Sequence, residues 1–366
     1  MKKDALVTYL RTKRVLFILV CIFLIAGTLV FAFAWSAGLI GGRITTRTFL
    51  KDTPKTYPAG YRRAHGKGIC FEGTFRASGK GVPFSIASVF AQQEVPVIGR
   101  FSLGSPDPYA PDNSTRTVSM ALMLTTDDGE QWRMKLNNEP YFATRDPEGF
   151  LKQMDAYKPN PSTGVPDPVR VAAFLKAYPE AKKYVKWDAT APWTRSFAGA
   201  QYNVINSFIL IDENGKKQAI RWSMRPHAPF TSWSVNQRKQ ASHDFLFEDL
   251  KKRLKKEPLY WDLVLTLAEP SDPVNDPSQV WPEKRRQIVA GTLEVSHVFD
   301  QTKGGCRDVN FDPTRVPKGI TLSNDPVLAA RAGIYSHSHS DRVREIGYGK
   351  ATDAVGKHQN NNPKNK

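Results

Sequence analysis

The chain has 366 residues, of which 40% are hydrophobic and 11% aromatic, so it is long and apolar enough to bury a sizeable core. Its 52 Lys and Arg residues outnumber its 35 Asp and Glu residues, which gives a formal net charge of +17. Because the basic residues are scattered and form no nucleic-acid-binding module, we expect no nucleic-acid partner and favour an anionic membrane surface.

The chain begins with a basic segment, residues 1–14, followed by residues 15–40, which carry no charge. This apolar run is longer than the roughly 7–15 residues of a signal-peptide core and is long enough to span a bilayer, so we predict a transmembrane anchor. Ala32-Phe33-Ala34 offers a small-x-small site, which leaves cleavage as an alternative. The basic flank predicts a cytoplasmic N-terminus. In a bacterium the protein would then be a single-pass inner-membrane protein with its body in the periplasm.

After a linker at residues 41–60, the segment 61–349 is predicted to fold, and the polar tail 350–366 is predicted to be disordered. Strands are predicted at 69–75, 84–90, 96–103, 117–125, 131–136, 207–211, 218–223, 259–267 and 293–298. Helices are predicted at 168–184 and 243–256. Because the strands are grouped around helices rather than alternating with them, we expect an α+β fold with an antiparallel barrel or sandwich.

The three cysteines, Cys21, Cys70 and Cys306, are too few for a disulfide framework. Cys21 lies in the apolar run. Cys70 and Cys306 could pair in an oxidising compartment, but their spacing alone does not decide whether they do.

A helix is predicted from Asp325 and Pro326, which suit an N-cap and the first helical position. Arg331 and Tyr335 are four residues apart and share one face, and Arg342 returns close to that face. Nearby positive charge favours a tyrosinate, which is a hard ligand for ferric iron. The alternative is a solvated basic helix whose single tyrosine packs against the body.

Further motifs lie upstream of this helix. In chain order they are Arg62-Arg63-Ala64-His65-Gly66-Lys67-Gly68, Arg100-Phe101-Ser102, Asn137-Asn138-Glu139-Pro140-Tyr141-Phe142, Arg145-Asp146-Pro147, Phe150, Trp281-Pro282, Phe311-Asp312-Pro313 and Pro317 to Ile320. Together with the Arg331 and Tyr335 pair, this ordered set resembles the haem catalases, and in particular the small catalase-related haem peroxidases. The run Ser336 to His339 departs from the family, which usually has an Asp-Thr pair after the tyrosine.

The resemblance implies a catalase-type antiparallel β-barrel with surrounding helices, a ferric haem b cofactor and a distal site. In that site His65 would be the acid–base group, Asn137 would orient the peroxide, and Ser102 would hydrogen-bond the imidazole. Asn138 would then be a turn residue. Phe142 and Phe150 would keep the distal pocket dry.

The resemblance also implies the residues that hold the haem. Arg62, Arg100 and Arg342 are similar to the family's haem-propionate and proximal arginines. Tyr335 would be the axial ligand of the haem iron, with Arg331 keeping it anionic.

The expected function is a peroxidase that reduces hydrogen peroxide or organic hydroperoxides, with weak catalase activity. Its electron donor could be a quinol, a cytochrome or a small organic reductant, and its oligomeric state is left open. Within the same fold, a haem hydroperoxide isomerase of the allene oxide synthase type is an alternative. A tethered haem-binding or sensing protein without turnover, and a haem-free binding barrel, are alternatives from other classes.

Overall fold

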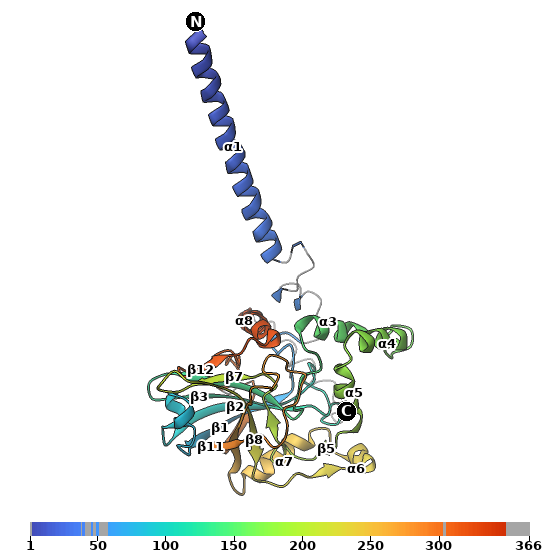
Figure 1. Ribbon diagram of the computed structural model, residues 1–366. Helices are drawn as coiled ribbons and strands as arrows, with labels where there is room; N and C mark the ends of the chain where they lie inside the picture. The colour runs from blue at the N-terminus through green and yellow to red at the C-terminus, as the bar shows by residue number, and fades with distance from the viewer. Residues whose placement is uncertain are drawn as a thin grey trace. The chain divides into compact units, whose positions relative to one another are not determined.

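The basic N-terminal segment and most of the apolar run form one long helix, α1 (Lys2–Ser36), in the computed structural model of the chain (Figure 1). The structure describes residues 2–37, 39–40, 45–46, 49–50, 58–302 and 305–348. Within α1, residues Lys13–Ser36 are long and apolar enough to cross a membrane, a property that a signal sequence shares. The predicted tail, and most of the predicted linker, lie outside the described residues. The chain divides into two compact units, residues 1–52 and 53–366.

The second unit is built on an antiparallel sheet of ten strands. They are β1 (Gly68–Ala77), β2 (Val95–Leu103), β3 (Val118–Thr125), β4 (Gln131–Asn137), β6 (Tyr202–Asn203), β7 (Phe208–Ile211), β8 (Lys217–Pro226), β10 (Leu259–Leu267), β11 (Gln287–Asp300) and β12 (Ile320–Leu322). Their order is β10-β11-β1-β2-β3-β4-β6-β8-β7-β12, and an additional pairing of β10 with β8 closes the sheet into a barrel. The predicted α+β class with an antiparallel barrel is confirmed. Two short strands, β5 (Trp193–Thr194) and β9 (Ser232–Trp233), form a separate pair.

Helices surround this barrel (Figure 1). They are α3 (Pro147–Ala156), α4 (Pro168–Ala177), α5 (Ala181–Thr190), α6 (Val235–Gln240), α7 (Phe245–Leu254) and α8 (Pro326–Gly347). As predicted, α8 starts at an Asp325 N-cap, whose side chain accepts from the backbone N–H groups of Val327 and Leu328. Helices α3 and α8 pack against each other.

Large side chains fill the barrel interior. Phe71, Phe101, Trp132, Trp222 and Trp261 are all buried in one core. Along β4, Trp132, Met134 and Leu136 belong to this core, whereas Lys135 and Asn137 alternate with them and point to the opposite, outer face. Because the interior is filled, polar groups from these strands gather on the outside of the barrel.

Three predicted elements differ from the structure. Residues 84–90 form no strand; two short 3₁₀ turns (Val82–Phe84 and Ser88–Phe90) replace it, and Pro83 suits the first of them because it lacks an N–H. The predicted helix 168–184 is interrupted between α4 and α5, where Pro179 cannot continue the hydrogen-bond ladder. The predicted strand 293–298 is only part of β11, which is longer because it pairs with both β1 and β10.

Candidate active site

Strand register brings residues from distant parts of the sequence together on the outer face of the barrel. One row across β1, β2, β3 and β4 consists of Gly68, Ser102, Ser119 and Asn137. The next row consists of Cys70, Arg100, Ala121 and Lys135. Side chains at opposed positions of neighbouring strands lie within contact distance, so these rows form one continuous patch.

His65 reaches this patch from the turn before β1. Its backbone φ of 56° is the only positive value of a non-glycine residue in the described part of the chain. Such a conformation costs on the order of 1 kcal/mol and is typical of functional positions. Its Nδ1 lies 2.9 Å from the carbonyl oxygen of Leu103 and 3.1 Å from Ser119 Oγ. Because a carbonyl oxygen only accepts, Nδ1 carries the proton and Nε2 keeps a free lone pair.

The hydroxyl beside the imidazole belongs to Ser119, which corrects the prediction for Ser102. The two serines face each other across β2 and β3. The His65 ring contacts the carbonyl oxygen of Leu103 at the end of β2. This contact holds the ring where the hydroxyl of Ser119, on β3, reaches Nδ1. Ser102 itself is buried in the same row.

The surroundings of His65 keep its imidazole neutral. Burial lowers the pKa of His65 well below its usual value of 6.5, and the positive charges of Lys135, Arg100 and Arg331 lower it further. The lone pair on Nε2 is therefore available as a base at neutral and mildly acidic pH.

Asn137 is the centre of a polar network. Its Oδ1 accepts from Ser119 Oγ at 2.6 Å and from Lys135 Nζ at 2.6 Å, and its Nδ2 donates to Glu139 Oε1 at 2.6 Å. An unbroken chain of hydrogen bonds thus leads from His65 through the Ser119 hydroxyl to the Asn137 amide. One of the two Nδ2–H groups of Asn137 is not used by this network.

Asn138 is committed to the backbone of the turn instead. Its Oδ1 accepts from the N–H of Val118 at 3.0 Å, and its Nδ2 donates to the carbonyl oxygen of Arg116 at 3.0 Å. These bonds agree with the prediction that Asn138 is a structural residue, and they leave Asn137 as the amide of the site.

Three arginines, Arg62, Arg100 and Arg342, form a cluster of positive charge, which we call the arginine cluster; Arg100 and Arg342 are buried and Arg62 is half-buried. Burial, together with the positive charge of Arg342, lowers the pKa of Arg62 well below its usual value and that of Arg100 to about 9. Within the described ranges of the chain none of the three forms an ion pair, and Arg342 Nη2 is buried without a hydrogen-bond partner. A Cβ on Gly68 would lie 2.3 Å from Arg100 Cζ, so the cluster needs glycine there.

The carbonyl oxygen of Gly66 accepts from Arg100, and the segment after β11 supplies the other acceptors for the arginine cluster. They are Gln301 Oε1 for Arg100, the carbonyl oxygens of Cys306, Arg307 and Val309 for Arg62, and that of Arg307 for Arg342. A disulfide between Cys70 and Cys306, with 5.6 Å between their Cα atoms, ties this segment to β1. Both cysteines are fully buried. The pairing that the sequence left open is thus present.

Helix α8 places Arg331 and Tyr335 together through a second chain of hydrogen bonds. Arg331 Nη2 donates to the phenolic oxygen of Tyr335 at 2.9 Å, and its Nη1 donates to Asn206 Oδ1 at 2.6 Å. Asn206 Nδ2 in turn donates to Asp325 Oδ2 at 2.7 Å. The N-cap residue Asp325 therefore fixes the Arg331 guanidinium through Asn206. Tyr335 lies one helical turn after Arg331 on the same face, as their four-residue spacing predicts.

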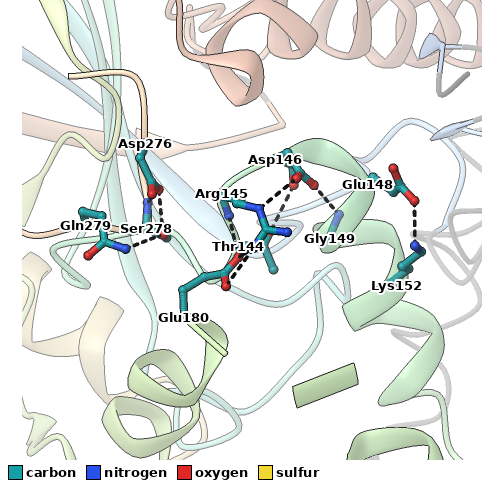
Figure 2. Close-up of polar contacts among 10 residues, drawn as sticks. All are labelled: Thr144, Arg145, Asp146, Glu148, Gly149, Lys152, Glu180, Asp276, Ser278 and Gln279. Atoms are coloured by element: carbon teal, nitrogen blue, oxygen red, sulfur yellow. Dashed lines mark hydrogen bonds and ion pairs between the residues drawn. The ribbon is translucent and has the colours of Figure 1, made fainter. Parts of the chain in front are cut away.

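Phe142 and Phe150 pack against each other, with 5.0 Å between their ring centroids. Figure 2 shows how the start of α3, which carries Phe150, is held: Asp146 caps the helix, and Arg145 Nη1 bonds Glu180 at 3.1 Å. Because Glu180 stands at the start of α5, this ion pair joins the two helices. Both rings are half-buried.

Comparison with known proteins gives one consistent result. The family model described as Catalase matches residues 59–350. Two proteins named Catalase-related peroxidase are similar to the chain. The one from Synechococcus elongatus is 34% identical over 287 residues, covering 78% of this chain and 85% of its own length. The one from Mycolicibacterium paratuberculosis is 30% identical over 282 residues, covering 76% and 88%.

Solved structures give the same fold. A fungal catalase matches with a TM-score of 0.70 and 18% identity over 79% of this chain. A bacterial catalase matches with a TM-score of 0.68 and 21% identity, also over 79%. The chain spans only 60% of the fungal protein and 58% of the bacterial one. At these identities the likeness shows the fold alone.

Three residues of the network were missed by the sequence analysis: Ser119, Lys135 and Glu139. Strand alternation alone would have placed Ser119 and Lys135 on the outer face. It does not distinguish a site residue from an ordinary solvated residue on that face. The burial that makes Lys135 and Glu139 unusual, at 9% and 7% exposed, arises only from packing of the loops and helices over the strands.

Proposed function

Because this chain belongs to the catalase family and is an oxidoreductase acting on peroxide, we propose that it is a haem-dependent peroxidase. It would reduce hydrogen peroxide or organic hydroperoxides with electrons from a separate donor, and release oxygen from hydrogen peroxide only slowly. The similarity to two proteins named Catalase-related peroxidase supports this choice over an efficient catalase.

The charges of the site suit a ferric haem b. No described carboxylate forms an ion pair with the arginine cluster, since the nearby Asp308 pairs with Arg307, and two haem propionates would provide anions for it. Tyr335 would bind the iron through its phenolic oxygen, which Arg331 Nη2 fixes in place by donating a hydrogen bond to it at 2.9 Å. When bound, the haem would supply the iron at which the peroxide is reduced.

The protein's own groups would move the proton and orient the substrate. His65 Nε2 would accept the proton of the peroxide and return it to the leaving oxygen as water or alcohol. The free Nδ2–H of Asn137 would donate to a peroxide oxygen and align it. Phe142 and Phe150 would exclude water from this step.

The observation that carries the proposal is the arrangement of His65. A neutral imidazole is held in a rare backbone conformation, with its Nδ1 proton engaged and its Nε2 lone pair free. A protein that only carries or senses haem has no need of such an oriented base.

The proposal includes a place in the cell. We take α1 as a single-pass anchor in a bacterial inner membrane with the folded domain in the periplasm, where a quinol, a cytochrome or a small organic reductant could act as donor. The apolar span and the buried disulfide, which suits an oxidising compartment, support this assignment.

The test uses the full chain in detergent, loaded with haem, and follows consumption of hydrogen peroxide and of an organic hydroperoxide with and without a hydroquinone. The proposal predicts that the hydroquinone strongly accelerates consumption of both peroxides, and that without it hydrogen peroxide is lost only slowly, with release of oxygen. Loss of the organic hydroperoxide without donor oxidation would favour the isomerase alternative. A haem spectrum that ignores peroxide would favour haem carriage or sensing, and absence of haem would refute the proposal.

A further inference from the structure

Two buried charged residues, Lys135 and Glu139, flank the amide of Asn137 on opposite sides. Lys135 Nζ donates to Asn137 Oδ1 at 2.6 Å, and Glu139 Oε1 accepts from Asn137 Nδ2 at 2.6 Å. Lys135 and Glu139 form no direct ion pair with each other or with another described residue within 4.0 Å. The amide therefore stands between a donor and an acceptor that meet only through it.

Ser119 alone cannot orient this amide, because a hydroxyl can donate to Oδ1 or accept from Nδ2. An ammonium has only donors and a carboxylate has only acceptors, so charged Lys135 can bond only Oδ1 and charged Glu139 can bond only Nδ2. One charged partner is therefore enough to fix the orientation of the amide. Only the state in which both residues are neutral would allow the reverse orientation.

This pair is costly to bury. Burial lowers the pKa of Lys135 well below its usual value and raises that of Glu139 to about 7, each opposed by the charge of the other. Glu139 Oε2 is also buried without a hydrogen-bond partner within the described part of the chain. An apolar residue at position 135 would avoid the cost of a buried amine, so packing gives no reason for the lysine.

We propose that Lys135 and Glu139 are positioning residues that hold the Asn137 amide in one orientation, with Oδ1 towards Ser119 and one Nδ2–H left for the substrate. The proposal rests on the proposed haem site. Held in this way, Oδ1 receives the Ser119 proton, so Ser119 Oγ accepts from His65 and reinforces the Nδ1–H tautomer. The lysine also draws electron density from the amide oxygen, which makes the free Nδ2–H a stronger donor.

Fluoride, which accepts hydrogen bonds when it binds ferric haem, probes this donor without turnover. In the haem-loaded full chain, Lys135→Met and Glu139→Leu should each weaken fluoride binding about 10–100-fold, the effect of one hydrogen bond to a charged ligand. Glu139→Gln keeps an acceptor and should rescue most of the loss. Arg133→Met removes a cation from the same face of β4, where Arg133 bonds Gln131 and Asn310 rather than Asn137, and should stay within about twofold of wild type.

A double-mutant cycle separates positioning from plain electrostatic attraction. If Lys135 acts through Asn137, then Lys135→Met in an Asn137→Ala background should have no further effect on fluoride binding. An equal loss in both backgrounds, or no loss in either, would overturn the proposal.

A second measurement needs no haem. The measurement is the NMR spectrum of the chain carrying isotope-labelled asparagine, in which the signal that disappears in Asn137→Ala belongs to the Asn137 side-chain amide. One proton of this amide should have a strongly downfield chemical shift, and Glu139→Leu should remove that downfield shift. An ordinary Asn137 signal in the wild type would overturn the proposal. If the chain bound no haem, the proposed function would fail, while this measurement would still decide the orientation of the amide.

Discussion

The two polar regions of the site differ in how their charged groups are paired, although each leaves one buried atom, Glu139 Oε2 or Arg342 Nη2, without a partner among the described residues. Around Asn137, the hydrogen bonds run without a gap from His65 to Glu139. In the arginine cluster, the cations have only neutral acceptors and Arg342 Nη2 has no partner among the described residues. The hydrogen bonds of the first region fix its own geometry, whereas in the second no described carboxylate forms an ion pair with the three arginines. We infer that the first region acts on a substrate and that the second binds an anionic ligand.

The largest expected effect tests the first region. His65→Ala removes the base while Ser119 and Asn137 can still bond each other, so the reaction of the haem-loaded chain with peroxide should slow by about 10²–10⁴-fold. Stopped-flow absorption measures this rate, and haem content should remain that of the wild type. A His227→Ala variant controls for loss of an imidazole. His227 follows β8 and bonds Asp262 on β10, outside the hydrogen-bond network of His65. A rate within a few-fold of wild type would show that His65 is not the acid–base group.

Arg342→Met tests the second region through effects of opposite sign. Haem affinity should fall about 10–100-fold, because a charge-assisted bond to a carboxylate is lost. Without haem, the unfolding free energy should stay constant or rise, because a buried, unpaired cation has been removed. Haem titration and urea unfolding measure the two effects, with Arg344→Met, an exposed arginine paired with Asp341, as the control. A large loss of stability without haem would mean that the cluster is satisfied by the protein itself.

The disulfide joins the arginine cluster to the barrel, so its removal should affect that region and spare the other. Cys70→Ser combined with Cys306→Ser should lower the unfolding free energy by about 2–4 kcal/mol. It should also weaken haem binding several-fold, since Cys306 and its neighbours hold Arg62. Fluoride affinity of the protein that retains haem should not change. Cys21→Ser, at the free cysteine, serves as the control.

The smallest effect concerns pH and Glu139. Burial raises its pKa from 4.5 to about 7, so between these values the folded state binds more protons than the unfolded state. The contribution of the Glu139 carboxyl to the unfolding free energy is therefore largest below about pH 4.5. It declines as the pH rises towards about 7. The difference in unfolding free energy between Glu139→Gln and the wild type should therefore change with pH. It should be about 1–3 kcal/mol more favourable to the variant at about pH 8 than at about pH 5. Urea unfolding at both values measures this, and the exposed Glu148→Gln should show no such difference.

Much of this arrangement could be predicted from the sequence, because it depends on local order. The α8 cap, the four-residue spacing of Arg331 and Tyr335, and the short alternating strands all follow from neighbours along the chain. Which serine meets His65 depends instead on how the turn before β1 lies over the ends of β2 and β3, which no local pattern specifies. Lys135 and Glu139 look like solvated residues in the sequence, and only tertiary packing makes them buried.

The absorption spectrum of Tyr335→Phe tests whether Tyr335 binds haem iron beside the arginine cluster. The full chain and the variant would be mixed with equimolar ferric haem and compared, with Tyr348→Phe, at the exposed end of α8, as control. We predict a tyrosinate-type ferric spectrum for the wild type and the control, and loss of haem or a clearly different spectrum for Tyr335→Phe. An unchanged spectrum in Tyr335→Phe would contradict the assignment of the site.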